Sequence, residues 1–214
     1  MSYKKIIKQI KTDRMEQAVL IASQLFLENG IENVAMTDIA KACDVGVASL
    51  YRYFGTKTTL VIKSGTLLWE DLQLLFDGVF DTEDYLNKTG IEQLSELLDF
   101  FNILYSSHKN FLRFTHDFDL FIIKEKVGKA ELIDYENSIL NILPMFEKAY
   151  EKGCTDGTVK PGLDARILFF TISHALMSLC QRFISGVILT SDKYVSKEKE
   201  LEQMITMIIS YFKI

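Results

Sequence analysis

Glycine and proline are scarce in this sequence, with 11 glycines and two prolines among 214 residues. Turn-rich all-β folds need these residues at closely spaced turns, so their scarcity excludes a β-sandwich and favours long, uninterrupted helices. Hydrophobic residues make up 48% of the chain and charged residues 25%, which provides enough apolar surface for a sizeable core. The composition therefore indicates a folded protein of one or two domains.

Cysteine is also rare. Cys43, Cys154 and Cys180 are odd in number and far apart, and no CxxC or His-flanked spacing is present. This pattern excludes a disulfide framework and a structural zinc site, and it is typical of a reducing compartment. No apolar signal core follows the basic N-terminus, so we expect the protein to be cytoplasmic.

Only one long hydrophobic run is present, at 167–189. It contains a single formal charge, Arg182, but it also contains His174 and Gln181. These polar groups would be costly in the hydrocarbon of a membrane. A helix buried in the core or at a subunit interface explains the same composition at lower cost, and we prefer that interpretation to a membrane span.

Motifs of catalysis and of cofactor binding are missing. The sequence has no phosphate loop, no nucleophile elbow and no pair of carboxylates at catalytic spacing. His116 and Asp119 would share one helical face, but no third metal ligand can be identified. We therefore expect no enzymatic activity, no cofactor and no metal.

Charge is distributed unevenly over a chain whose net charge is −5. Residues 1–63 carry nine Lys or Arg against six acids, whereas the other 151 residues carry 15 against 23. A mildly basic N-terminal part joined to an acidic body is typical of a nucleic-acid reader with a second function, although ordinary helical proteins show it too.

Hydrophobic periodicity is helical almost everywhere, which predicts an all-α fold. A first helix ends at Asn29-Gly30, two short helices are separated by the break at 44–46, and Thr56 is a good N-cap for a long helix. Two short helices joined by a tight turn and braced by a longer one form a helix-turn-helix. A plain helical corner inside a bundle is the alternative.

The residues of this motif are specific. Met36-Thr37-Asp38-Ile39-Ala40, then Val45, then the string Leu50-Tyr51-Arg52-Tyr53-Phe54-Gly55-Thr56-Lys57 resemble the DNA-binding domain of the tetracycline-repressor (TetR) family. The resemblance covers roughly residues 12–63, about a quarter of the chain. It implies a three-helix DNA-binding domain at 1–63 and a helical domain for effector binding and dimerisation at 64–214.

The resemblance also implies roles at the matched positions. Val47, Ala48 and Ser49 at the start of the recognition helix would contact base edges. Tyr51, Arg52 and Tyr53 in its middle would contact the groove and phosphates. Thr37 on the supporting helix and Lys57 at the start of the fourth helix would contact further phosphates. Core packing is an equal alternative for Tyr51, while Phe54 is expected in the core.

Three positions depart from the family pattern. Ala35 and Gly46 stand where hydroxyl residues usually cap the two short helices, and Asp44 replaces the usual turn glycine. These changes bear on DNA affinity rather than on the fold. The basic N-terminal tail (Lys4, Lys5, Lys8 and Lys11) either adds DNA contacts or remains solvated and frayed.

Beyond residue 80 we expect a loop at 81–84 and five more helices. They are placed at about 90–107, 110–127, 131–152 with a kink at Pro144, 163–189 and 196–213. The last two have broad apolar faces, more than a monomer would leave bare. The family forms a four-helix dimer bundle with the corresponding pair, so we expect a homodimer that binds double-stranded DNA at a pseudo-palindromic operator, with a monomeric core as the alternative.

Fourteen aromatic residues lie between residues 64 and 150. Most must pack in the core, but family members hold an effector among these helices, which implies a small, largely hydrophobic ligand. Candidate ligand contacts are Trp69, Phe76, Phe101, Tyr105, Phe114, His116, Phe118, Tyr135, Phe146 and His174, with Asp119 as a further polar candidate. The function predicted is a DNA-binding transcriptional regulator, a repressor released or engaged by its effector. The alternative is a helical small-molecule-binding protein with weakened or lost DNA binding.

Overall fold

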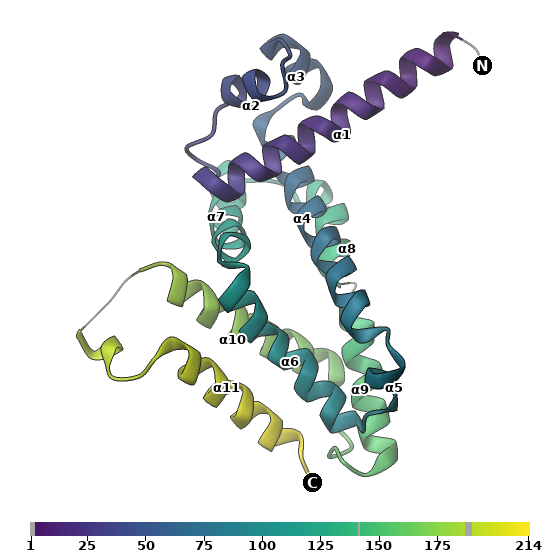
Figure 1. Ribbon diagram of the computed structural model, residues 1–214, viewed down its shortest axis with the longest axis vertical. Coiled ribbons are helices and arrows are strands. Elements are labelled where there is room, and N and C mark those ends of the chain that lie inside the picture. Colours follow the sequence, from purple (N-terminus) through teal and green to yellow (C-terminus); the bar gives the residue numbers. More distant parts are fainter. Residues whose placement is uncertain (1–2, 141, 187–189) are drawn as a thin grey trace. The chain divides into compact units, whose positions relative to one another are not determined.

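The computed structural model describes residues 3–140, 142–186 and 190–214, and these residues form helices joined by short connections (Figure 1). In this described part the only β-type pairing is an isolated bridge between Val159 and Lys213, which confirms the all-α fold. In chain order the elements are α1 Tyr3–Asn29, α2 Met36–Ala42, α3 Val47–Phe54, α4 Lys57–Phe80, α5 Glu83–Asn87, α6 Gly90–Ser107, α7 Lys109–Glu125, η1 Lys129–Leu132, α8 Ile133–Leu140, α9 Leu143–Asp156, α10 Ala165–Ile184, η2 Thr190–Lys193 and α11 Lys197–Phe212.

The chain forms two compact units. The first comprises Met1–Leu72 and Phe114–Ser138, and the second comprises Gln73–Arg113 and Ile139–Ile214. The predicted boundary between residues 63 and 64 differs from this division, because α4 continues into the second unit and a segment from α7 to α8 joins the first. No sequence pattern at 114–138 distinguishes that segment from its neighbours.

Local sequence explains the helix-turn-helix in the first unit. Gly30 ends α1 at φ +82°, and Asp44 adopts φ +52° in the turn between α2 and α3. Both values lie in the left-handed region, which Gly tolerates fully and Asp better than most residues. Phe26, Ile39 and Leu50 are fully buried between α1, α2 and α3, so the three helices share one core.

The second unit is organised around α6, which packs against α9, α10 and α11. Its closest helix contact is with α9, where a Cβ at Gly90 would lie 2.0 Å from the backbone nitrogen of Gly153. Aromatic rings fill the remaining core. Phe76 on α4 lies 3.6 Å from Phe100 on α6 between ring centroids, and Phe146 on α9 packs against Phe212 on α11.

Several predicted helices are confirmed closely, among them 90–107, 110–127 and 196–213. Three predictions were wrong. The span 131–152 is not one kinked helix: Pro144 lies in the first turn of α9, where a missing N–H costs nothing. The acidic loop at 81–84 leads into α5, capped by Thr82. The N-terminal tail is not frayed, because α1 begins at Tyr3.

Candidate nucleic-acid interface

Helix α3 has one buried and one exposed face. Leu50 and Phe54 point into the core of the first unit, whereas Ala48, Tyr51 and Arg52 are exposed. Tyr51 is 49% exposed, which favours a surface role over the core alternative. Val47 and Ser49 are half-buried in the first turn. The residues predicted to contact DNA from α3 therefore all lie outside its buried stripe, with Tyr53 half-buried as well.

Cations gather on this face around Tyr53. The Arg52 guanidinium lies 5.6 Å from the centre of the Tyr53 ring, and the Lys11 ammonium of α1 lies 5.9 Å from the same centre. Arg52 also donates a 3.4 Å hydrogen bond to the Ser49 hydroxyl. The positive surface thus extends from α3 to α1. The sequence pointed to Lys11 only as part of a basic tail and did not predict its contact with Tyr53.

The departures at the helix caps have local consequences. Ala35 provides no side-chain cap for α2, but its backbone N–H donates to Asp38 at 2.8 Å, which is half of a capping box. Gly46 caps α3 without a side chain. Thr56 does cap α4, because its hydroxyl accepts from the Thr59 N–H at 3.1 Å. The helices begin where expected even though two cap hydroxyls are missing.

Lys57 makes contacts within the first unit that the sequence did not predict. Its ammonium donates to the Ile31 carbonyl at 2.6 Å and lies 5.8 Å from the centre of the Phe121 ring on α7. Burial lowers the pKa of Lys57, and the carboxylate of Glu32 opposes this effect. The ammonium is thus directed toward Ile31 and Phe121 in the first unit, and its contact with a phosphate stays a prediction. The backbone N–H groups at the start of α4 remain a predicted phosphate contact as well.

Helix α7 braces the loop that connects α1 to α2. Lys124 on α7 forms a 2.9 Å ion pair with Glu32, and this hydrogen bond lowers the pKa of Glu32 and raises that of Lys124. Lys57 and Phe121 meet beside the same loop. No local pattern predicts these contacts, since 92 residues separate Glu32 from Lys124.

The predicted ligand contacts fall into both units. In the first, the Phe118 and Tyr135 rings stack at 4.2 Å, the Trp69 indole N–H donates to the Tyr135 hydroxyl at 3.1 Å, and Phe114 lies 5.9 Å from Phe118. These four side chains are buried. Their mutual packing is what a hydrophobic core requires, so ligand contact by them stays a prediction.

In the second unit, Phe76, Tyr105 and Phe146 are buried, and Phe101 is half-buried. Burial raises the pKa of the Tyr105 hydroxyl, and the Tyr105 ring packs edge-on to Phe183.

Neither histidine candidate is fully buried. His116 on α7 is half-buried, whereas His174 on α10 is exposed. Contact of either histidine with a ligand stays a prediction. The position of His174 on an outward face of α10 results from helical phase, which the nearly continuous apolar pattern of this segment did not reveal.

The remaining candidates for chemistry are possible metal ligands and the thiol of Cys43. No group of three or more His, Cys, Asp or Glu side chains suited to a metal ion occurs among the described residues. Burial raises the pKa of the Cys43 thiol, which disfavours the reactive thiolate. Cys43 was predicted to be inert, and this shift is in the expected direction.

Comparison with known proteins places this helix-turn-helix in a family context. Residues 21–63 match the model of the bacterial regulatory proteins of the tetR family. The chain is 28% identical over 170 residues to the HTH-type transcriptional regulator SAR2658 of Staphylococcus aureus (strain MRSA252), a match that covers 74% of this chain and 82% of that protein.

Solved structures share the fold over nearly the whole chain. A protein from Saccharomonospora viridis in complex with choline has a TM-score of 0.70 at 17% identity, with 95% of this chain and 99% of that one covered. FadR from Bacillus subtilis in complex with stearoyl-CoA has a TM-score of 0.63 at 16% identity, with 92% and 98% covered. The shared architecture therefore extends well beyond residues 21–63.

Proposed function

We propose that the chain is a DNA-binding transcriptional regulator of the TetR family of bacterial regulatory proteins, and that it is a cytoplasmic repressor that binds a pseudo-palindromic operator as a homodimer. The observation that supports operator binding best is the accessible face of α3, where Arg52 and Tyr53 lie beside Lys11 of α1. An arginine and a tyrosine hydroxyl on a groove-entering helix suit bases and phosphates.

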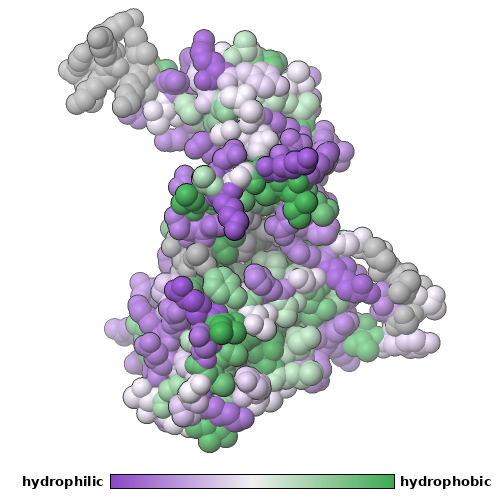
Figure 2. All heavy atoms as spheres, turned by 180° about the vertical axis from the view of Figure 1, so that it is seen from behind, coloured by the Kyte–Doolittle hydropathy of each residue, from purple (hydrophilic) through white to green (hydrophobic). Residues whose placement is uncertain are grey.

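The proposed dimer interface consists of α10 and α11. Helix α10 is long and apolar enough to cross a membrane by composition, yet only 28% of its apolar window is buried in the single chain. Ile167 on α10 is 64% exposed, and Met207 and Tyr211 on α11 are 59% and 55% exposed. Hydrophobic residues are visible on the surface of this unit in Figure 2. A second copy would cover these faces, and it would bring a second α3 to the adjacent half-site.

We further propose that a small, largely hydrophobic effector controls operator binding. The buried aromatic side chains of both units suit an apolar ligand, and a structural relative was solved with stearoyl-CoA. Helix α4 begins beside the DNA-contacting helix and contributes residues to both units, so it is the element expected to transmit a change between two states.

The first experiment is a pull-down of sheared genomic DNA by the purified protein, followed by sequencing of the bound fragments. The expected result is enrichment of one or a few sites that share a short inverted repeat. Binding to such a site should weaken steeply with rising salt, because phosphate contacts release counterions.

The opposite outcome is equally informative. If a folded dimer enriches no site at low salt, with or without added long-chain acyl-CoA, the protein is better explained as a helical small-molecule-binding protein that has lost DNA binding. The missing cap hydroxyls at Ala35 and Gly46 would then account for the loss.

A further inference from the structure

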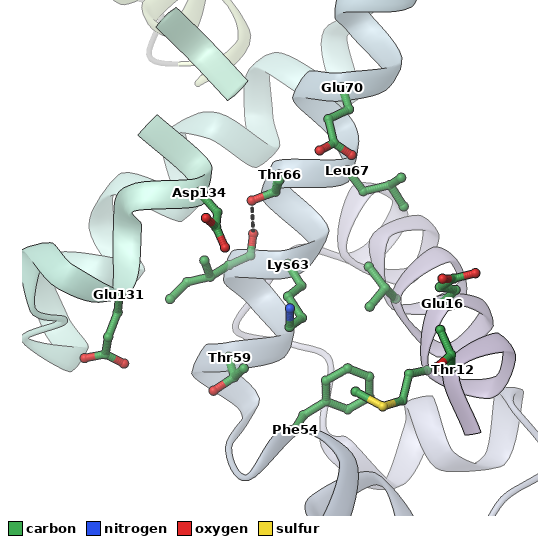
Figure 3. A pocket seen from close by; sticks show the side chains of 13 residues that line it. Thr12, Glu16, Phe54, Thr59, Lys63, Thr66, Leu67, Glu70, Glu131 and Asp134 are labelled. Carbon is green, nitrogen blue, oxygen red and sulfur yellow. Dashed lines mark hydrogen bonds between the residues drawn. The ribbon is translucent and has the colours of Figure 1, made fainter. Parts of the chain in front are cut away.

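The first unit contains a groove that is separate from the aromatic clusters. Its volume is about 630 Å³, and all of its lining residues belong to that unit. Figure 3 shows α4 between α1 on one side and the segment of η1 and α8 on the other. The last residue of α3, Phe54, also lines the groove, so an occupant would contact the base of the recognition helix.

The lining combines apolar surface with carboxylates. Apolar contacts come from Met15, Val19, Phe54, Ile62 and Leu67. The acids come from four different elements and are Glu16 on α1, Glu70 on α4, Glu131 on η1 and Asp134 on α8. The lining thus contains four carboxylates and one ammonium, that of Lys63, so its formal charge is −3.

We propose that this groove binds a small organic cation with an apolar body. The excess of carboxylates attracts positive charge, while the apolar residues stabilise the uncharged part of the same molecule. A bare metal ion does not fit, because no three of the acidic side chains described converge closely enough to hold one. This inference does not depend on the proposed effector, whose expected contacts are the aromatic side chains.

The test uses two probes of nearly equal shape and opposite charge, tetraphenylphosphonium and tetraphenylborate. Equilibrium dialysis of the full-length protein against each probe, in sodium buffer at physiological ionic strength, gives its affinity and stoichiometry. The expected result is one tetraphenylphosphonium bound per chain and much weaker binding of tetraphenylborate. Affinity for the cation should fall as salt rises, because the carboxylates are exposed.

Variants locate the site. Glu70→Gln/Asp134→Asn removes two lining charges, and Asp71→Asn/Glu136→Gln removes two exposed charges from the same helices outside the groove. The first double variant should weaken cation binding by about tenfold, whereas the second should leave it nearly unchanged. Lys63→Gln should strengthen binding by about threefold. Far-UV circular dichroism and thermal unfolding establish that each variant is folded.

Four results would overturn the proposal. They are failure of the folded wild-type protein to bind tetraphenylphosphonium, equal affinity for the two probes, equal weakening by both double variants, and no weakening by either. The last result would place the bound cation elsewhere in the chain. None of these results bears on operator binding, so the groove and the proposed function can fail separately.

Discussion

Single side chains on α3 are expected to determine which DNA sequence this protein recognises. Arg52 is exposed, stays close to Ser49 and Tyr53 through short contacts, and lies opposite the buried Leu50. Its guanidinium is therefore accessible from solvent, and its contacts with Ser49 and Tyr53 restrict the rotamers it can adopt. Tyr53 is half-buried, so its ring is positioned by packing against Phe54, at 6.3 Å between centroids.

The double variant Arg52→Ala/Tyr53→Ala should lose operator binding by about a hundredfold or more, because each side chain supplies one contact of about 1–3 kcal/mol. Fluorescence anisotropy with the enriched operator measures the loss. Sedimentation analysis should show the same oligomeric state as wild type. Arg113→Ala, which removes an exposed arginine from the second unit, is the control. A dimer lost together with DNA binding would contradict the assigned role of α3.

At the scale of the helix, two kinds of contact at the start of α6 fix its packing against α9. The first is close backbone approach, since a Cβ at Gly90 on α6 would clash with the backbone of Gly153 on α9. The second is capping. Asp156 accepts from the Gly90 N–H at 2.7 Å, and the Thr89 N–H donates to Glu92 at 2.8 Å. Together they hold α6 against α9 at one defined register.

Gly90→Ala should destabilise the fold by about 3 kcal/mol or more, because its Cβ would meet backbone atoms that cannot move aside. Gly78→Ala is the matched control, since a Cβ there meets nothing within 4 Å inside α4. That change should stabilise the protein by about 0.5–1 kcal/mol through helix propensity. Urea unfolding followed by circular dichroism distinguishes the two. Equal effects at both positions would refute the close contact.

Asp156 should make stability depend on pH. The Thr158 hydroxyl and the N–H groups of Gly90 and Thr158 lower the pKa of Asp156 from its ordinary value of 3.8. A lowered pKa stabilises the folded state fully above the ordinary value, and this stabilisation is lost as the pH falls through the lowered pKa.

Thermal unfolding of wild type and Asp156→Asn at several pH values tests this expectation. The difference in Tm should be largest above about pH 5 and should close below pH 3.8. The effect should be modest because the carboxylate is exposed. A difference that stays constant down to acidic pH would show that the charge of Asp156 is irrelevant.

At the scale of the whole molecule, we expect a second copy of the chain to cover the exposed apolar surface of α10 and α11. The outward residues of α10 include Ile167, Ala175 and Ser178, so small side chains permit close approach of another helix. On α11, Met207 and Tyr211 lie four residues apart on one face. We therefore expect oligomerisation to depend on these two helices.

Met207→Glu should convert the homodimer into a monomer, because it would bury a charge without a counter-charge at the interface. Ile123→Glu on α7 is the control, since Ile123 is 74% exposed in the first unit. Light scattering coupled to size exclusion measures both masses. The monomer should also bind the operator more weakly, since it occupies one half-site. A Met207→Glu variant that remains a dimer would exclude α11 as a central contact.

Much of the helix-turn-helix could be predicted from the sequence. Thr56 as a cap, Asp44 at positive φ and the break at Gly30 all depend on residues a few positions apart. Pro144 shows the limit of local interpretation. A proline can kink a helix or stand in its first turn. Pro144 stands in the first turn of α9 because α8 ends before it, which the local sequence does not show.

The sequence by itself determined the helical class, the helix-turn-helix and the resemblance to the TetR family, because periodicity, capping and the string from Leu50 to Lys57 are properties of neighbouring residues. The tertiary structure alone decided that Lys57 points inward to Ile31, that Lys11 reaches Tyr53 and that Lys124 braces Glu32. It also decided that acids from four elements line one groove. These outcomes depend on packing between segments far apart in the chain, which local patterns do not encode.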